Sequence, residues 1–159
     1  MITKILVGVD GSENSKKALD KALEIADKFD ASVLILNVFQ PPPEFGYNLN
    51  MFPQASEYPK ETTSYQPNMT SFIKDLRKIH EEVLSKDIER ATKLKPFLKI
   101  TAELREGNAA SQIVETAANG EFDLIVIGHR GGSEIKELFL GSTSERVAHR
   151  AKCNVLITK

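Results

Sequence analysis

The chain is predicted to fold as an α/β protein with an open, parallel, five-stranded sheet covered by helices on both faces. Three observations lead to this prediction. Short runs of aliphatic and β-branched residues alternate with segments whose apolar residues recur at helical spacing. Three of the strand-like runs are apolar throughout, which is typical of strands buried on both faces. Most links between segments are short, and a strand, a helix and a second strand joined in this way form a right-handed unit with parallel strands.

Nine segments along the chain account for this fold. Each expected strand is a run of mostly apolar residues, and only the third alternates apolar with polar positions. Each expected helix carries apolar residues three and four positions apart. The expected strands are 5–9, 33–39, 100–104, 124–127 and 154–158, and the expected helices end near 29, span 70–94, end near 119 and begin at 142.

Helix caps and inward faces follow from the same spacing. Asp10 and Glu13 have the spacing of a capping box, with Ser12 as an alternative cap, and Ser142 with Glu145 repeats that spacing. Asn108 is the expected cap of the third helix. The predicted inward faces are, in chain order, Ala18, Leu19, Ala22, Leu23, Ala26 and Phe29; Phe72, Leu76, Ile79, Val83, Leu84, Ile88 and Ala91; Ala110, Ile113, Val114 and Ala117; and Val147, Ala148 and Ala151.

The character of the strands also predicts their order in the sheet. The first, second and fourth strands are continuous apolar runs and favour interior positions. The alternating third strand and the short fifth strand suit the edges. The order 3-2-1-4-5 satisfies both conditions with right-handed crossovers.

Length and composition exclude several classes of protein. The 159 residues suit one domain, 1–159, with a long proline- and tyrosine-containing loop insertion at about 40–68. The net charge of −1 gives no indication of binding to nucleic acid or to a membrane surface. Cys153 is the single cysteine, so no intrachain disulfide forms. No apolar stretch reaches the roughly 20 residues that span a bilayer, and no signal peptide is seen, so a cytoplasmic location is expected.

The ligand crevice of an open parallel sheet lies beyond the carboxyl ends of the strands, where the winding reverses. In the predicted order, this point falls between the first and fourth strands, and both end in glycine-bearing turns, 8–11 and 128–131. Glycines permit close approach to the backbone, and a helix beginning near Ser142 points free N–H groups at the same place. The hydroxyls of 142–144 add donors that suit phosphate oxygens. Asp10 suits a ribose hydroxyl, a base, or a magnesium ion reached through water.

Two familiar phosphate-binding signatures are absent. No lysine precedes Ser142, which excludes a P-loop, and no G-x-G-x-x-G follows the first strand. The spacing that is present, Gly128-x-x-Gly131, nine residues, then Gly141-Ser142, resembles the G-2x-G-9x-G-S/T signature of the ATP-binding universal stress proteins. The opening 5–12, Ile-Leu-Val-Gly-Val-Asp-Gly-Ser, and the ending 153–157, Cys-Asn-Val-Leu-Ile, are similar to that family too.

The resemblance covers nearly the whole chain and implies a Rossmann-like fold of the adenine nucleotide alpha hydrolase type, with strand order 3-2-1-4-5. It also implies ATP, with Mg²⁺ as a possible companion, in the crevice between the first and fourth strands. His129 departs from the family, which commonly has a small hydroxyl residue there. By position, the resemblance assigns the adenosine part to Gly8, Asp10, Val38, Ile127 and Gly128, and the phosphates to Arg130, Gly131, Gly141, Ser142, Thr143 and Ser144.

Plainer interpretations stand beside these assignments. The stretch 128–144 also fits a strand-to-helix turn that Ser142 merely caps, and Asp10 fits an N-cap as well as a ligand contact. Arg130 also fits a solvated loop cation. His80, His129 and His149 lack the spacing of metal ligands with each other or with Cys153, so no metal site is predicted.

The functional hypothesis is a cytoplasmic, homodimeric universal stress protein that acts as a nucleotide-dependent switch. No catalytic residue is assigned, because no Ser-His-Asp arrangement, carboxylate pair or activated lysine stands out. The alternatives are a slow ATPase or nucleotidyl-type enzyme that uses the same crevice, and a partner-binding dimer without nucleotide. The last strand, 154–158, ends the chain with an uncovered edge, and the resemblance likewise implies dimers through this strand.

Overall fold

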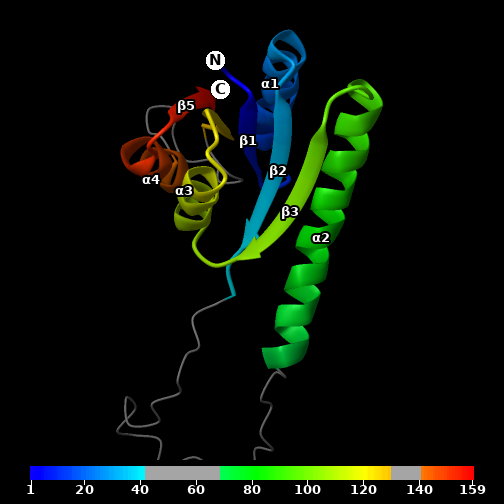
Figure 1. Cartoon of the computed structure of the whole chain (residues 1–159). Coiled ribbons are helices and arrows are strands. Elements are labelled where there is room, and N and C mark those ends of the chain that lie inside the picture. Colours follow the sequence, from blue (N-terminus) through cyan, green and yellow to red (C-terminus); the bar gives the residue numbers. More distant parts are fainter. Residues whose placement is uncertain (42–68, 130–140) are drawn as a thin grey trace, which may run out of the picture.

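The computed structural model describes residues 1–41, 69–129 and 141–159. For residues 69 and 70 it describes the backbone alone. Five parallel strands form one sheet in the order β3-β2-β1-β4-β5, which confirms the predicted order. Four helices alternate with the strands along the chain (Figure 1). The elements are β1 (Lys4–Val9), α1 (Glu13–Phe29), β2 (Ser32–Phe39), α2 (Met69–Leu94), β3 (Ile100–Glu106), α3 (Ala109–Asn119), β4 (Leu124–Gly128), α4 (Ser142–Arg150) and β5 (Asn154–Thr158).

The two faces of the sheet carry separate hydrophobic cores. On one face, α1 and α2 pack on alternate residues of β1 and β2, including Ile5, Val7 and Ile35. On the other face, α3 and α4 pack on Leu6, Leu36 and neighbouring residues of the central strands. Successive side chains of a strand point to opposite faces, so an interior strand must be apolar at nearly every position to fill both cores. This requirement explains the continuous apolar runs of β1, β2 and β4.

The register of the strands brings the carboxyl ends of β2, β1 and β4 to one edge. Val9 lies beside Asn37 in the β1–β2 pair, and Val7 lies beside Val126 in the β1–β4 pair. β5 pairs in parallel with β4 from Asn154 to Thr158 and is an edge strand of the sheet. The topological switch point, where the strand order reverses, therefore lies between β1 and β4. A ligand crevice of an open parallel sheet forms at such a point.

The helix caps differ from two of the predictions. Ser12, not Asp10, is the N-cap of α1, and its Oγ accepts a hydrogen bond of 3.2 Å from the backbone N–H of Ser15. Asp10 instead accepts the N–H of Ser12 at 2.9 Å and shapes the turn before the cap. Helix α3 is capped by Asn108 as predicted, with its Oδ1 bonded to the N–H of Ser111.

Most of the predicted inward positions are buried or half-buried, as expected. Phe29, at the last turn of α1, is exposed, and so is Ala148 of α4. Phe72 and Ile79 of α2 are half exposed or more, at 50% and 59%. Helix α2 has 26 residues, about 39 Å, whereas the eight residues of β2 span about 26 Å, so its first turns extend beyond the sheet. Figure 1 shows this overhang at the carboxyl ends of β2 and β3.

Candidate functional site

Two segments of the glycine signature meet in space at the end of β4. The backbone N–H of Gly141 donates to the carbonyl of His129 at 2.9 Å, which joins the residue after β4 to the residue before α4. Ser144 is buried, and its Oγ lies 3.0 Å from the His129 carbonyl and 2.9 Å from the Gly141 carbonyl. The N–H of His129 in turn donates to Thr158 of β5 at 2.7 Å. Gly128 and the 141–144 turn are therefore fixed side by side.

The start of α4 has free hydrogen-bond donors. Its N-cap is Gly141, which has no side chain to accept an N–H, so the predicted capping box of Ser142 and Glu145 is wrong. The N–H of Glu145 donates to the Gly141 carbonyl at 3.0 Å, and among the described residues no carbonyl accepts the N–H groups of Ser142, Thr143 and Ser144, the first three of the helix. Free N–H groups and the positive end of the helix dipole attract an anion.

The hydroxyls of the turn divide into two kinds. Ser142 is exposed and Thr143 is half-buried, so neither side chain is fully enclosed. Ser144 has a single hydroxyl hydrogen, and two backbone carbonyls compete for it. In this structure Ser144 fastens the turn, and its assignment as a phosphate ligand stays a prediction. Arg130 and Gly131 lie outside the described residues.

Gly128 is required for the packing of α1. A β-carbon on Gly128 would lie 2.8 Å from the backbone carbon of Asn14 and 2.9 Å from its oxygen, closer than real β-carbons approach. A β-carbon on Gly8 would meet only the side-chain ends of Ile127 and Ile113, at 3.1 and 3.2 Å. Protein atoms therefore lie beside both glycines, which gives each a packing reason of its own, and their assignment to the adenosine part of a nucleotide stays a prediction.

The remaining predicted contacts lie along the same edge. Asp10 is exposed, and its Oδ1 accepts the N–H of Ser12, whereas its Oδ2 has no hydrogen-bond partner among the described residues. Gly11 follows with φ of +82°, a conformation that glycine adopts without strain. Ile127 is buried and Val38 is half-buried, both on the α3 and α4 face, so a ligand would meet Ile127 through its backbone.

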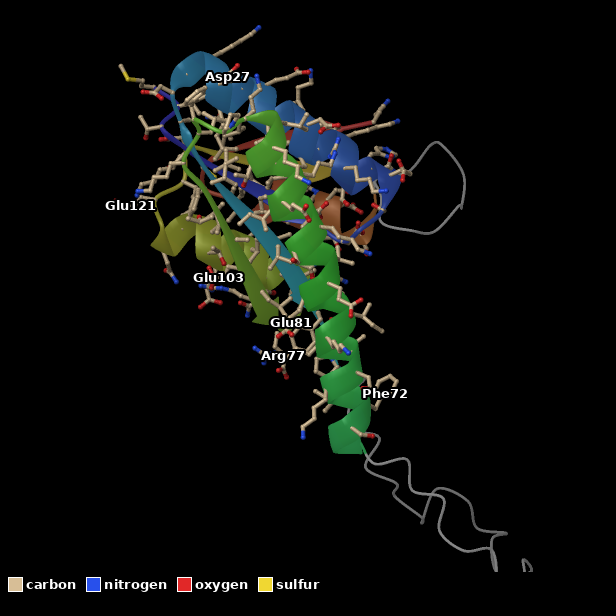
Figure 2. The ribbon with its side chains drawn as sticks, turned by 90° about the vertical axis from the view of Figure 1, so that its right-hand side faces the viewer. Asp27, Phe72, Arg77, Glu81, Glu103 and Glu121 are labelled. Carbon is tan, nitrogen blue, oxygen red and sulfur yellow. The ribbon has the colours of Figure 1, made fainter. Side chains whose placement is uncertain are left out.

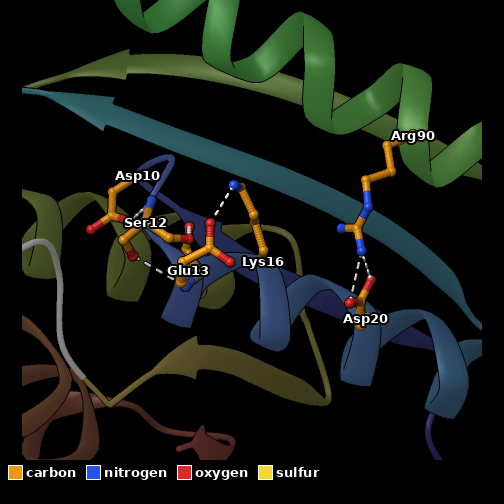
Figure 3. A network of polar contacts seen from close by, with 7 residues as sticks. Asp10, Ser12, Glu13, Lys16, Asp20 and Arg90 are labelled. Carbon is orange, nitrogen blue, oxygen red and sulfur yellow. Dashed lines mark hydrogen bonds and ion pairs between the residues drawn. The ribbon is translucent and has the colours of Figure 1, made fainter.

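A polar seam, where α2 meets α1 and β2, was not anticipated from the sequence. In Figure 3, Arg90 extends from α2 to Asp20 of α1, and its Nη2 lies 2.6 and 2.8 Å from the two carboxylate oxygens. The side chain of Asn37 is fully buried, and its Oδ1 lies 2.7 Å from Nδ1 of His80. The signal for this seam was Asn37 itself, the one polar residue inside the apolar run 33–39.

Three buried atoms of this seam have no hydrogen-bond partner among the described residues, namely Asn37 Nδ2, Asp87 Oδ2 and Arg90 Nη1. Burial raises the pKa of Asp87. The positive charges of Arg90 and Lys16 act against this shift, and the negative charge of Asp10 adds to it. Burial lowers the pKa of His80, against the charge of Asp10, which acts in the opposite direction. The charge of Asp10 therefore acts on both of these α2 side chains.

Two absences can be stated for the part of the chain that the structure describes. Residues 1–41, 71–129 and 141–159 contain no group of three or more His, Cys, Asp or Glu side chains that could hold a metal ion. No helix within the described ranges is long and apolar enough to cross a membrane.

Comparison with known proteins places the chain in a family. The model of the Universal stress protein family matches residues 1–159. Universal stress protein YxiE of Bacillus subtilis is 31% identical over 161 residues and is covered in full, as is this chain. Universal stress protein UspA from Lactobacillus plantarum has the same fold, with a TM-score of 0.75 at 22% identity over 99% of this chain and 97% of that one.

One solved relative carries a nucleotide. A universal stress protein in complex with cAMP matches with a TM-score of 0.67 and 25% identity, over 99% of this chain and 97% of that one. The match of the family model over the full chain, the full-length relatives and the shared fold agree. The chain belongs to the universal stress protein family.

Proposed function

We propose that this protein binds ATP at the β1/β4 crevice and acts as a nucleotide-dependent switch in a stress response. The observation that carries the proposal is the start of α4, where three N–H groups that have no partner among the described residues lie beside the end of β4. The Gly128-x-x-Gly131 and Gly141-Ser142 spacing and the cAMP bound by a relative support a nucleotide in this crevice.

The proposal assigns described residues to each part of the nucleotide. The N–H groups and hydroxyls of Ser142 and Thr143 suit phosphate oxygens. The free oxygen of Asp10 suits a ribose hydroxyl, and the end of β2 at Val38 suits the base. Arg130 and Gly131 join the phosphate site in the proposal on the signature alone. Any Mg²⁺ would arrive with the phosphates, because this ion is usually held by one or two carboxylates and phosphate oxygens.

A substitution at Ser142 separates ligand binding from folding. Ser142→Glu places a negative charge at the first residue of α4, which stabilises a helix start but repels a phosphate. The proposal predicts an unchanged or higher melting temperature and a loss of ATP affinity of about tenfold or more by calorimetric titration. Ser142→Ala is the control and should lose much less. Equal ATP affinity in wild type and Ser142→Glu would contradict the phosphate site.

We also propose that two chains pair through β5 and that ATP hydrolysis is slow. β5 pairs only with β4 on one side within the described sheet, so its other edge has free backbone groups. Asp10 is the exposed acid of the proposed site, and the buried Oδ2 of Asp87 has no hydrogen-bond partner among the described residues. Turnover at about 10 per second or faster, typical of an enzyme, would contradict the switch.

A further inference from the structure

His129 is a titratable residue of the glycine signature to which the proposed function gives no role. It directly follows Gly128 at the end of β4 and is half-buried. Its backbone joins this end of the sheet to the start of α4. The carbonyl of His129 accepts the N–H of Gly141 at 2.9 Å, and the Oγ of Ser144 lies 3.0 Å from the same carbonyl. The direction of the imidazole therefore decides whether a histidine side chain lies beside the proposed phosphate site.

The alternation of side chains along β4 gives that direction. Ile127 packs in the core under α3 and α4, whereas a β-carbon on Gly128 would point to the other face, 2.8 Å from the backbone carbon of Asn14 in α1. His129 continues the β4–β5 ladder, because its N–H donates to the Thr158 carbonyl at 2.7 Å. Its side chain therefore lies on the face of α3 and α4, which Figure 1 shows together on one side of the sheet. The first N–H groups of α4 lie on this same side.

The imidazole of His129 has no hydrogen bond or ion pair among the described residues. Charged side chains stand on each element around it, and they are Asp10 after β1, Glu13 and Lys17 in α1, Glu145 and Arg146 in α4, and Lys159 after β5. Arg77 and Glu81 belong to α2, which covers the opposite face of the sheet (Figure 2). A histidine side chain takes up a proton as the pH falls from 8 to 5 and then carries a positive charge.

We propose that the imidazole of His129 contacts the phosphates of the bound nucleotide and adds a proton-dependent positive charge to the site. The inference rests on the proposed function and adds a phosphate-binding residue to it. A protonated imidazole donates charge-assisted hydrogen bonds from both ring nitrogens, whereas the neutral ring donates from one nitrogen without a net charge. Wild type therefore gains ATP affinity at low pH relative to a variant that lacks the imidazole.

The experiment titrates full-length wild type, His129→Ser and His129→Lys with ATP at pH 6 and at pH 8. A terminal phosphate group itself titrates near pH 6. Affinities are therefore compared between proteins at the same pH, where the titration of ATP and the other charges of the site cancel. Wild type should bind ATP about fivefold more tightly than His129→Ser at pH 6, and about equally at pH 8.

His129→Lys keeps a positive charge at both pH values. It should match wild type at pH 6 and bind ATP about fivefold more tightly than wild type at pH 8. His149, which is exposed in the last turn of α4, offers the matched control. His149→Ser should follow wild type at both pH values. Melting temperatures of all variants at both pH values check that the fold is retained.

Several outcomes would overturn the inference and are distinct from a failure of the proposed function. If wild type binds ATP, but its affinity relative to His129→Ser is the same at pH 6 and pH 8, the imidazole brings no charge to the phosphates while the nucleotide site stands. Weaker binding by His129→Lys than by His129→Ser at both pH values would place the phosphates away from this side chain. Loss of the pH dependence in His149→Ser would assign the titration to that residue. If wild type binds no ATP at either pH, the proposed function itself fails, and the inference with it.

Discussion

Gly128 at the end of β4 lies so close to Asn14, in the first turn of α1, that a β-carbon on Gly128 would be 2.8 Å from the backbone carbon of Asn14. The close approach of these two residues joins the end of β4 to the start of α1. It also sets the distance between the two turns that border the crevice. The glycine at the start of the signature thus has a packing reason of its own, and the ligand site depends on that packing.

Gly128→Ala is expected to destabilise the fold by about 1 to 3 kcal/mol, because backbone atoms of α1 must move to admit the methyl group. Gly8→Ala is the comparison, since its new methyl meets only the ends of Ile127 and Ile113 and should cost less. Chemical denaturation of both variants measures the difference. A Gly128→Ala protein as stable as wild type would contradict the packing role of this glycine.

The cap of α1 and the ligand contact of Asp10 can be separated by mutation. Ser12→Ala removes the bond to the Ser15 N–H and should lower the free energy of unfolding by about 1 kcal/mol. Asp10→Ala removes the free carboxylate oxygen and should lower ATP affinity by a larger factor than Ser12→Ala does. Denaturation and calorimetric titration of both variants test this division. The reverse pattern, with Asp10→Ala costing only stability, would return Asp10 to a structural role.

Asp87 should make the fold less stable at neutral pH than at mildly acidic pH. Its pKa in the folded state is raised chiefly by burial, so folding disfavours the charged form. The penalty is present above the folded pKa and fades as the pH falls through that value toward the unfolded pKa. Asp87→Asn should therefore raise stability at pH 7, and its advantage should shrink as the pH is lowered toward 4.

Glu89→Gln is the matched control for Asp87→Asn, because Glu89 is exposed and lies two residues away on α2. The hydrogen bond and charge of Lys93, at 2.7 Å, lower the pKa of the Glu89 carboxyl. A group with a lowered pKa contributes stability above its unfolded pKa and loses it as the pH falls, which is the opposite direction. Denaturation curves between pH 4 and pH 7 compare the two variants. Parallel pH profiles for Asp87→Asn and wild type would contradict the burial of a charged group at this position.

Pairing through β5 predicts a dimer that depends on the free edge of that strand. Ile157→Pro removes one backbone N–H from the outer edge of β5, because the Thr158 carbonyl bonds on the β4 side and the backbone groups of successive residues alternate between the two sides. Sedimentation should show twice the chain mass for wild type at micromolar concentration and a shift toward one chain mass for the variant. Circular dichroism checks that the variant remains folded. A monomeric wild type would contradict the pairing.

The strand order could be predicted because burial on two faces leaves a direct trace in the sequence. The apolar runs that contain Ile5, Ile35 and Ile125 identified interior strands, and the alternation from Ile100 to Leu104 identified an edge. The exposure of Phe72 and Ile79 could not be predicted, because helical spacing gives the face of a helix and not how far the helix extends past its sheet.

The polar contacts of the site were harder to predict, because they join residues far apart in the chain. Asn37 and His80 are 43 residues apart, and Asp20 and Arg90 are 70 apart. Spacing rules also could not choose between neighbouring hydroxyls and a glycine as caps, so Asp10 and Ser142 were assigned a role that Ser12 and Gly141 fill. Local hydrogen-bonding preferences are similar for these residues, and the path of the chain decides.

The nucleotide site is tested most directly by a calorimetric titration of the full chain with ATP, run beside a titration with adenosine. We predict saturable binding of ATP and much weaker binding of adenosine, because the donors at the start of α4 contact only the phosphates. Absence of saturable ATP binding at millimolar concentration, or equal affinity for ATP and adenosine, would contradict the proposed site.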